Sequence, residues 1–219
     1  MDFDAIFQAL PLFGQAALLT VRISVFGIAL SLLVGTVCAA IQNFRIPILR
    51  HIVGVYIELS RNTPLLVQLV FLYYGLPKLG LVWSGEACAV IGLAFLGGSY
   101  MAEALRSGLE AVPHIQFHSA VALGLTRFQA FRYVVVPQGV ATSMPALSAN
   151  VVFLVKETSV VSIIAVPDLV YRAKEMIGIA YNTTEALTLL VAFYLVIVLP
   201  ISLGARWLEG KARNYAVAE

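Results

Sequence analysis

Two pairs of opposite charges stand inside apolar stretches, and their types and spacing could act on a polar solute. Glu58 and Arg61 are three positions apart, and so are Glu103 and Arg106. Residues three apart share one face of a helix. A charge within a membrane costs at least about 2.5 kcal/mol, so such side chains face a protein interior or pair with one another. For Glu58 and Arg61 two interpretations stay open: a polar lining for a solute path, or an ion pair that only holds a kink at Pro64.

A third polar group closes another apolar stretch. It consists of Lys156, Glu157, Thr158 and Ser159. Charges and hydroxyls at the end of a membrane span could line the same path, or could cap a broken helix. Both interpretations of Lys156 and Glu157 stay open.

Enzyme chemistry has no comparable signal. The chain lacks the Gly-x-x-x-x-Gly-Lys-Ser/Thr phosphate loop, so it is not expected to hydrolyse a nucleotide by that route. Its three histidines, His51, His114 and His118, do not have the spacing of a zinc site. We therefore expect no catalytic residue, no metal and no cofactor in this chain.

Composition places these groups in a membrane protein. The 219 residues are 60% hydrophobic and 12% charged, with a mean hydropathy of +0.91. Soluble domains carry roughly 25% charged residues. The formal net charge of +2 gives no concentrated basic face, which argues against nucleic acid as a partner. Cys38 and Cys88 both lie in apolar runs, where packing is their expected role.

The apolar segments predict an all-α membrane protein with about five transmembrane helices in a single domain, 1–219. Spanning takes on the order of 20 apolar residues. The expected spans are approximately 16–42, 51–76, 86–110, 133–155 and 184–206. Four spans, or six if 163–166 is counted, are the alternatives. The segment 160–166 is too short to span and is expected to be re-entrant or interfacial. The Gly- and Pro-containing segment 75–80 predicts a loop.

Basic residues set the expected orientation, because they favour the cytoplasmic side. Arg45, Arg50, Arg127 and Arg132 fall on the same side as the basic C-terminal tail. The N-terminus is therefore expected outside and the C-terminus in the cytoplasm. Segment 115–126 is rich in Ser, Ala and Gly and lies on this basic side. It predicts a short cytoplasmic helix on which a soluble partner docks.

Four blocks in the right order resemble the polar amino acid permeases of ABC importers. His118-Ser119-Ala120, three residues, Gly124, nine residues and Val134-Val135-Val136-Pro137 are similar to the Glu-Ala-Ala loop of that family. The run 61–77 resembles its Arg-Gly-Thr-Pro block, and 156–169 resembles its Lys-Asp-Thr-Ser-Leu block. Segment 103–108 adds a fourth block, so the likeness covers nearly the whole chain.

Two positions depart from the family pattern. His118 stands where the family has Glu, and Ser119 stands where it has Ala. A salt bridge from that Glu is therefore missing or replaced by an imidazole contact. The small residues Ser119, Ala120 and Gly124 keep the shape of the loop.

The resemblance implies a multi-pass permease in the bacterial inner membrane, with a second permease chain as its partner, either a copy or a relative. It also implies two cytosolic ATPase subunits, which would bind the ATP and Mg, and an extracytoplasmic amino acid-binding protein. Contacts to the ATPase would come from His118, Ser119, Ala120, Gly124 and Pro137. The substrate path would involve Glu58, Arg61, Glu103, Lys156, Glu157, Thr158 and Ser159.

Two other function classes stay open on the residues alone. An ion-coupled secondary carrier of small polar solutes would use Glu58 and Glu103 as relay groups. A purely structural membrane subunit is disfavoured by the charges inside the spans.

Overall fold

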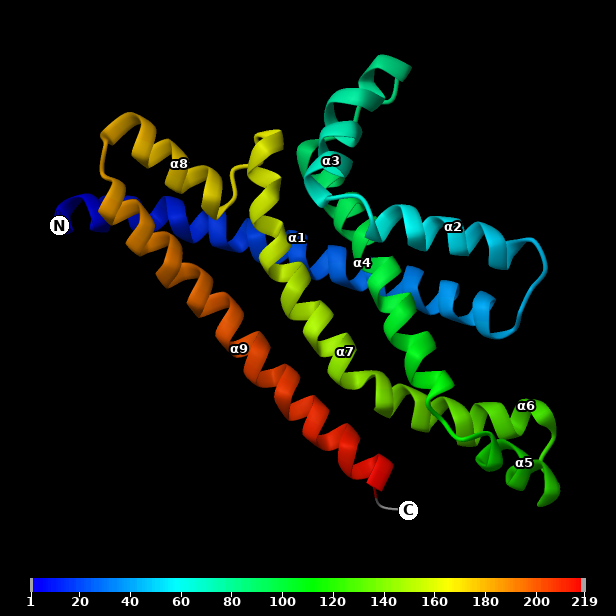
Figure 1. The fold of residues 1–219 in the computed structure, drawn as a ribbon. Helices are drawn as coiled ribbons and strands as arrows, with labels where there is room; N and C mark the ends of the chain where they lie inside the picture. The colour runs from blue at the N-terminus through cyan, green and yellow to red at the C-terminus, as the bar shows by residue number, and fades with distance from the viewer. Residues whose placement is uncertain (1, 218–219) are drawn as a thin grey trace.

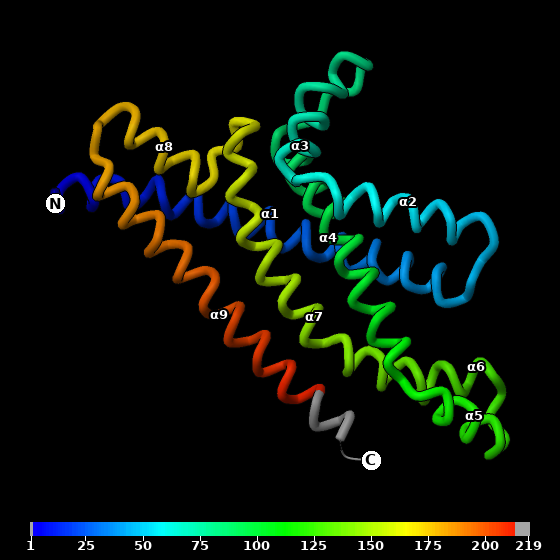
Figure 2. The backbone as a smooth tube through the Cα atoms, viewed as in Figure 1, coloured from blue at the N-terminus to red at the C-terminus, as the bar shows by residue number. Residues whose placement is uncertain are grey.

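The computed structural model describes residues 2–217, and every element in that range is helical (Figure 1, Figure 2). The expectation of an all-α fold is confirmed. In chain order the elements are α1 (Phe3–Asn43), α2 (Leu49–Arg61), α3 (Leu65–Val70), η1 (Phe71–Gly75), η2 (Leu76–Leu79), α4 (Gly85–Glu110), α5 (His114–Ala122), α6 (Arg127–Ala130), η3 (Phe131–Val135), α7 (Val136–Glu157), η4 (Thr158–Ile164), α8 (Leu169–Ala180) and α9 (Thr183–Val217).

Four helical segments are long and apolar enough to cross a membrane: Phe3–Asn43, Gly85–Glu110, Arg127–Ile164 and Thr183–Ala212. A shorter apolar segment, Leu65–Leu79, lies between the first two. The expected second span, 51–76, is not one helix, because α2 ends at Arg61 and α3 begins at Leu65. Pro64 is the last residue before α3, so the kink predicted there is a full break.

Two sequence expectations about connecting segments are wrong. The predicted loop 75–80 is mostly a 3-10 turn, η2, which ends at Gly80 with φ of 83°. The short segment 160–166, expected to be re-entrant or interfacial, instead belongs to η4 and the turn after it, and η4 directly continues α7. Its side chains Val161, Ile164 and Val166 are buried in the main hydrophobic core.

Helix α4 is central to the bundle, with α1 and α7 packed against it (Figure 1). Small residues allow the close approach. A Cβ on Gly35 of α1 would lie 2.5 Å from the Cβ of Met101, and one on Gly97 of α4 would lie 2.2 Å from Ser31 Oγ. The Ser31 hydroxyl also lies 3.1 Å from the carbonyl oxygen of Leu93. In a lipid bilayer the hydrophobic effect does not drive helices together. Close packing of the helix backbones through small residues stabilises their association instead.

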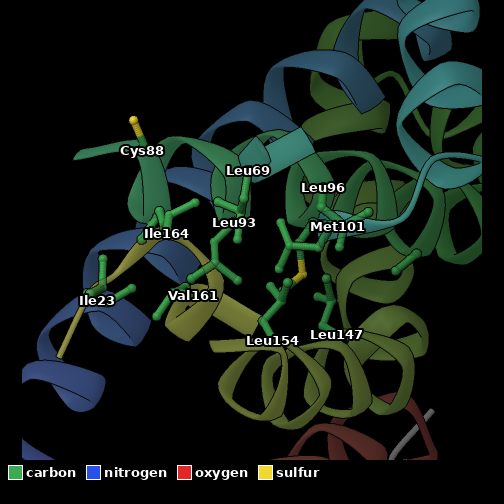
Figure 3. Packing of buried hydrophobic residues seen from close by; sticks show 14 residues of the cluster. Ile23, Leu69, Cys88, Leu93, Leu96, Met101, Leu147, Leu154, Val161 and Ile164 are labelled. Carbon is green, nitrogen blue, oxygen red and sulfur yellow. The ribbon is translucent and has the colours of Figure 1, made fainter. Parts of the chain in front are cut away.

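The main core lies where α1, α3, α4, α7 and η4 meet (Figure 3). Ile23, Leu69, Leu93, Leu154 and Val161 are each at most 1% exposed. Cys88 belongs to this cluster and Cys38 to a smaller one, and both thiols are free, as expected for packing residues.

Two wide turns precede two prolines, and the same physics explains both. Proline lacks an N–H and its ring clashes with the carbonyl four residues earlier. In η1, Leu76 N donates to Phe71 O, five residues back, immediately before Pro77. In η3, Val136 N donates to Phe131 O in the same way, immediately before Pro137. A π-turn thus absorbs the proline while each helix continues.

Candidate functional site

The guanidinium of Arg61 contacts α4 rather than its own helix. Its Nη1 lies 3.6 Å from Glu103 Oε2, and its Cζ lies 5.4 Å from the centre of the Tyr100 ring. Glu58, the partner expected from spacing, instead accepts a hydrogen bond of 3.1 Å from Asn62 Nδ2. Of the two interpretations, the ion pair within one helix is therefore wrong, and the observed pair ties the end of α2 to α4.

The break before α3 is held by a glutamine that the sequence reasoning missed. Gln68 Nε2 donates to the carbonyls of Ser60 at 3.2 Å and Thr63 at 3.1 Å. The Thr63 hydroxyl donates to Leu59 O at 2.6 Å. Non-helical backbone at membrane depth is tolerated only where neighbours satisfy it. A buried amide four residues after Pro64 was the available signal.

A cavity of about 360 Å³ opens beside this break, and we call it the Arg61 cavity. It brings together Arg61 from α2 and Glu157 from the end of α7, two residues predicted to lie on one path. The Tyr100 and Phe153 rings, with centres 5.5 Å apart, also line it. The other lining residues are Asn62, Thr63, Pro64, Leu65, Leu66, Leu96 and Val160. A guanidinium and a carboxylate among aromatic walls match the carboxylate and ammonium of an amino acid.

A second cavity, of about 510 Å³, lies at the α5 end of the molecule, and we call it the inner cavity. Glu58 and Glu103 line it. Arg106 lines it too and pairs with Glu103, with Nε 2.8 Å from Oε1, and with Glu110, with Nη1 2.6 Å from Oε2. Glu103 thus contacts Arg61 on one side and Arg106 on the other.

Three of the predicted path residues line neither cavity. Lys156 is exposed, and Ser159 is half-buried. Thr158 is fully buried, and its hydroxyl donates to Val155 O at 2.7 Å, as a residue at a helix end does. The predicted set of seven is therefore divided between the Arg61 cavity, the inner cavity and the α7–η4 junction.

Helix α5 and the turn after it form an exposed knob. His118 and Ser119 are exposed, whereas Ala120 is buried. Gly124 has φ of 97°, and the bonds from Gly124 N to Val121 O at 3.0 Å and from Leu125 N to Ala120 O at 3.2 Å close the helix end. The backbone at this position is left-handed, a conformation that glycine adopts without steric cost, which explains the glycine at 124.

Large apolar side chains surround the knob without cover. Ile115 is 67% exposed, Leu123 is 83% exposed and Phe128 is 70% exposed. The ring of His118, at the position of the family's Glu, packs edge-on against Phe117 with centres 5.8 Å apart. Pro137 lies further along the chain on α7, also exposed.

Asp168 caps α8 from a buried position between η4 and α8. Its Oδ1 accepts from Tyr171 N at 2.9 Å, while Oδ2 is buried without a hydrogen-bond partner. Burial raises the pKa of this carboxyl to about 6, against hydrogen bonds from Tyr171 and Val170 that lower it. Among the residues whose placement is described, no group of three or more His, Cys, Asp and Glu could hold a metal ion.

The family described as the binding-protein-dependent transport system inner membrane component matches residues 27–214. The chain belongs to that family. It is therefore the inner membrane part of a transport system that depends on a binding protein, as the resemblance implied. An ion-coupled carrier that works alone is not favoured.

Several curated relatives match almost end to end. The glutamine transport system permease protein GlnP of Escherichia coli is 33% identical over 215 residues, covering 97% of this chain and 98% of its own. The probable amino-acid ABC transporter permease protein PatM of Vibrio harveyi is 30% identical over 213 residues, covering 96% of each chain.

Solved structures agree with the fold. A crystal structure of an amino acid ABC transporter with histidines has a TM-score of 0.89 and 31% identity, covering 96% of this chain and 99% of the other. An inward-facing MetNI methionine ABC transporter, at 17% identity and a TM-score of 0.79, covers 94% of this chain and 98% of the other and shares the fold.

Proposed function

We propose that the chain is the permease subunit of an ATP-driven importer of polar amino acids. The observation that carries the proposal is the Arg61 cavity, which Arg61 and Glu157 both line. The names of the relatives support the substrate class, since they are called glutamine or amino-acid permeases.

Arg61 would bind the substrate carboxylate, because a guanidinium offers paired donors that match it. Glu157 would accept the ammonium, and Tyr100 and Phe153 would flank the aliphatic part. The Arg61–Glu103 contact holds the guanidinium toward α4. If the substrate carboxylate replaced Glu103 as the partner of Arg61, the link between α2 and α4 would loosen.

Helix α5 would transmit the conformational change of the ATPase subunits to the membrane-spanning helices. A second permease chain would complete the path, two cytosolic ATPase subunits would bind ATP and Mg, and an extracytoplasmic binding protein would deliver the amino acid. The uncovered Ile115, Leu123 and Phe128 around α5 support docking of a protein there. In this arrangement α5 and the C-terminus would lie in the cytoplasm and the N-terminus outside. The ATPases would shift the bundle between two states by binding them unequally.

The test is uptake in vesicles that contain the purified complex. Labelled glutamine, supplied with the binding protein outside, should accumulate only when ATP reaches the ATPase side. Uptake that needs a proton gradient and this chain alone would refute the proposal. Cysteine labelling of residues 115–126 only from the outer face would refute the docking role.

A further inference from the structure

The inner cavity is lined by two arginines that have no ion-pair partner among the described residues. Arg45, in the loop between α1 and α2, and Arg50, in the first turn of α2, both line it. Neither makes an ion pair with any side chain that the structure describes, whereas Arg106 in the same wall is paired twice. Glu58, further along α2, also lacks a cationic partner there and accepts only from Asn62.

These charges lie along one open face of α2. Arg50, Gly54 and Glu58 are four positions apart in turn and all line the cavity. At about 1.5 Å per residue the two charged positions are separated by about 12 Å along the helix. A Cβ built on Gly54 meets nothing within 4 Å. The face therefore carries positive charge at one end, negative charge at the other and free space between them.

The backbone beside the cavity is held in an unusual conformation. Arg45 has φ of 51° and Ile48 has φ of 65°, both in the left-handed half of conformational space. A β-branched residue such as Ile rarely takes positive φ. Such residues persist where the surroundings over-determine them, commonly at binding sites.

The mixture of charges selects the class of ligand. A phosphate or an anionic lipid headgroup would be attracted by Arg45 and Arg50 but repelled by the carboxylates of Glu58 and Glu110. A zwitterion satisfies both signs. The cavity also has apolar lining, from Ile57, Leu109, Val112, Phe117, Phe131 and Val135. A volume of about 510 Å³ is in the usual range for small-molecule sites.

We infer that the inner cavity is a second binding site for a free amino acid, separate from the Arg61 cavity. Arg45 and Arg50 bind the carboxylate, and Glu58 binds the ammonium. The two cavities share no lining residue, and they meet across the Arg61–Glu103 ion pair and the hydrogen bond from Asn62 to Glu58. The inference rests on the proposed function, because it takes α5 to mark the cytoplasmic end.

Occupancy of this site should slow import when product accumulates. The walls come from α2, α4, α5 and η3, so a bound ligand holds the docking helix against the bundle. A ligand that binds one state of a two-state protein shifts it toward that state. Amino acid on the cytoplasmic side would therefore resist the motion that the ATPases drive.

The experiment compares uptake into vesicles at different internal loads. Purified complex in vesicles takes up labelled glutamine with ATP inside, and the lumen holds unlabelled glutamine from zero to about 1 mM, the upper range of common KM values. The wild-type initial rate should fall as the load rises. Arg45→Gln with Arg50→Gln should raise the half-inhibiting load about tenfold, the effect of losing about 1.4 kcal/mol of binding.

A second variant and a control keep the test decisive. Gly54→Leu puts a bulky side chain on the cavity wall, at a position where a Cβ meets nothing within 4 Å, and keeps both charges, so it should also abolish the inhibition. Arg206→Gln removes an exposed basic residue from α9, away from the cavity, and should leave the inhibition unchanged. The inference is overturned if the wild-type initial uptake rate does not change with the internal glutamine concentration, or if the inhibition is equal in all variants.

Failure of the inference and failure of the proposed function give different results. Without ATP-driven uptake at zero load, the proposed function fails. In that case equilibrium binding of labelled glutamine to the purified complex, without the binding protein, still decides the site. Loss of glutamine binding in the Gly54→Leu variant supports the site. Unchanged glutamine binding in that variant overturns the inference.

Discussion

Arg61 Nη1 on α2 lies 3.6 Å from Glu103 Oε2 on α4, and this ion pair joins a residue that lines the Arg61 cavity to a residue that lines the inner cavity. Both partners are partly exposed, with 42% and 26% of their side chains accessible. Such pairs contribute about 0–1 kcal/mol to stability. The pair is therefore better suited to exchange partners than to hold the fold.

Arg61→Gln should impair transport far more than folding. Loss of a charge-assisted contact to a substrate carboxylate costs about 1.5–3 kcal/mol, so uptake should fall about tenfold or more. The melting temperature should change little, since the ion pair is weak. Uptake and thermal unfolding of the same preparation check this. Equal losses of folded protein and uptake would favour a scaffold role.

Gly124→Arg should uncouple ATP hydrolysis from uptake. It puts a bulky side chain on the knob at φ of 97°, a conformation that costs L residues about 1–2 kcal/mol. Gly80→Arg is the matched control, because Gly80 has φ of 83° and equally open surroundings at another place in the fold. ATPase activity and uptake are measured together. Wild-type uptake by the Gly124 variant would contradict the docking role of α5.

Gln68→Leu should destabilise the chain by about 1–3 kcal/mol, because the carbonyls of Ser60 and Thr63 lose their buried donor. Thermal unfolding in detergent measures the change. Thr142→Val is the control: it removes an exposed bond from Thr142 Oγ1 to Gln138 O, within one helix. Its effect should stay within about 0.5 kcal/mol. Equal effects of both changes would show that the break does not depend on Gln68.

Asp168 should make stability depend on pH. Its pKa is raised from 3.8 to about 6, so between those values the folded protein binds more protons than the unfolded chain. Its contribution is full below pH 3.8 and is lost as pH rises through 6, by up to roughly 3 kcal/mol. Unfolding across this window measures the slope.

Asp168→Asn keeps a cap for Tyr171 N and removes the titrating group, so its slope in that window should be flatter. Asp168→Ala should lose about 1 kcal/mol more than Asn through the missing cap. An unchanged slope in the Asn variant would mean that other groups carry the pH dependence.

The membrane class and the family followed from sequence because both depend on local patterns. Long apolar runs give spanning helices whatever surrounds them, and the blocks at 61–77, 103–108, 118–137 and 156–169 keep their spacing without any tertiary contact. The break at Pro64 was also predictable, since proline acts on its own helix. The amide that satisfies this break was not predicted, because Gln68 matters only through where its side chain reaches.

The sequence by itself determined an apolar helical chain with charges in its spans and a small-residue knob after the third predicted span. Only the tertiary structure decided which charges meet. Spacing favoured Glu58 as the ion-pair partner of Arg61. In the structure α2 packs on α4, so Arg61 pairs with Glu103, and Glu58 lines the inner cavity. Spacing along one helix fixes a face, whereas partners across helices depend on how closely and at what angle the helices cross. Gly98 of α4 allows the close approach of α2, because a Cβ there would lie 2.6 Å from the hydroxyl oxygen of Tyr56.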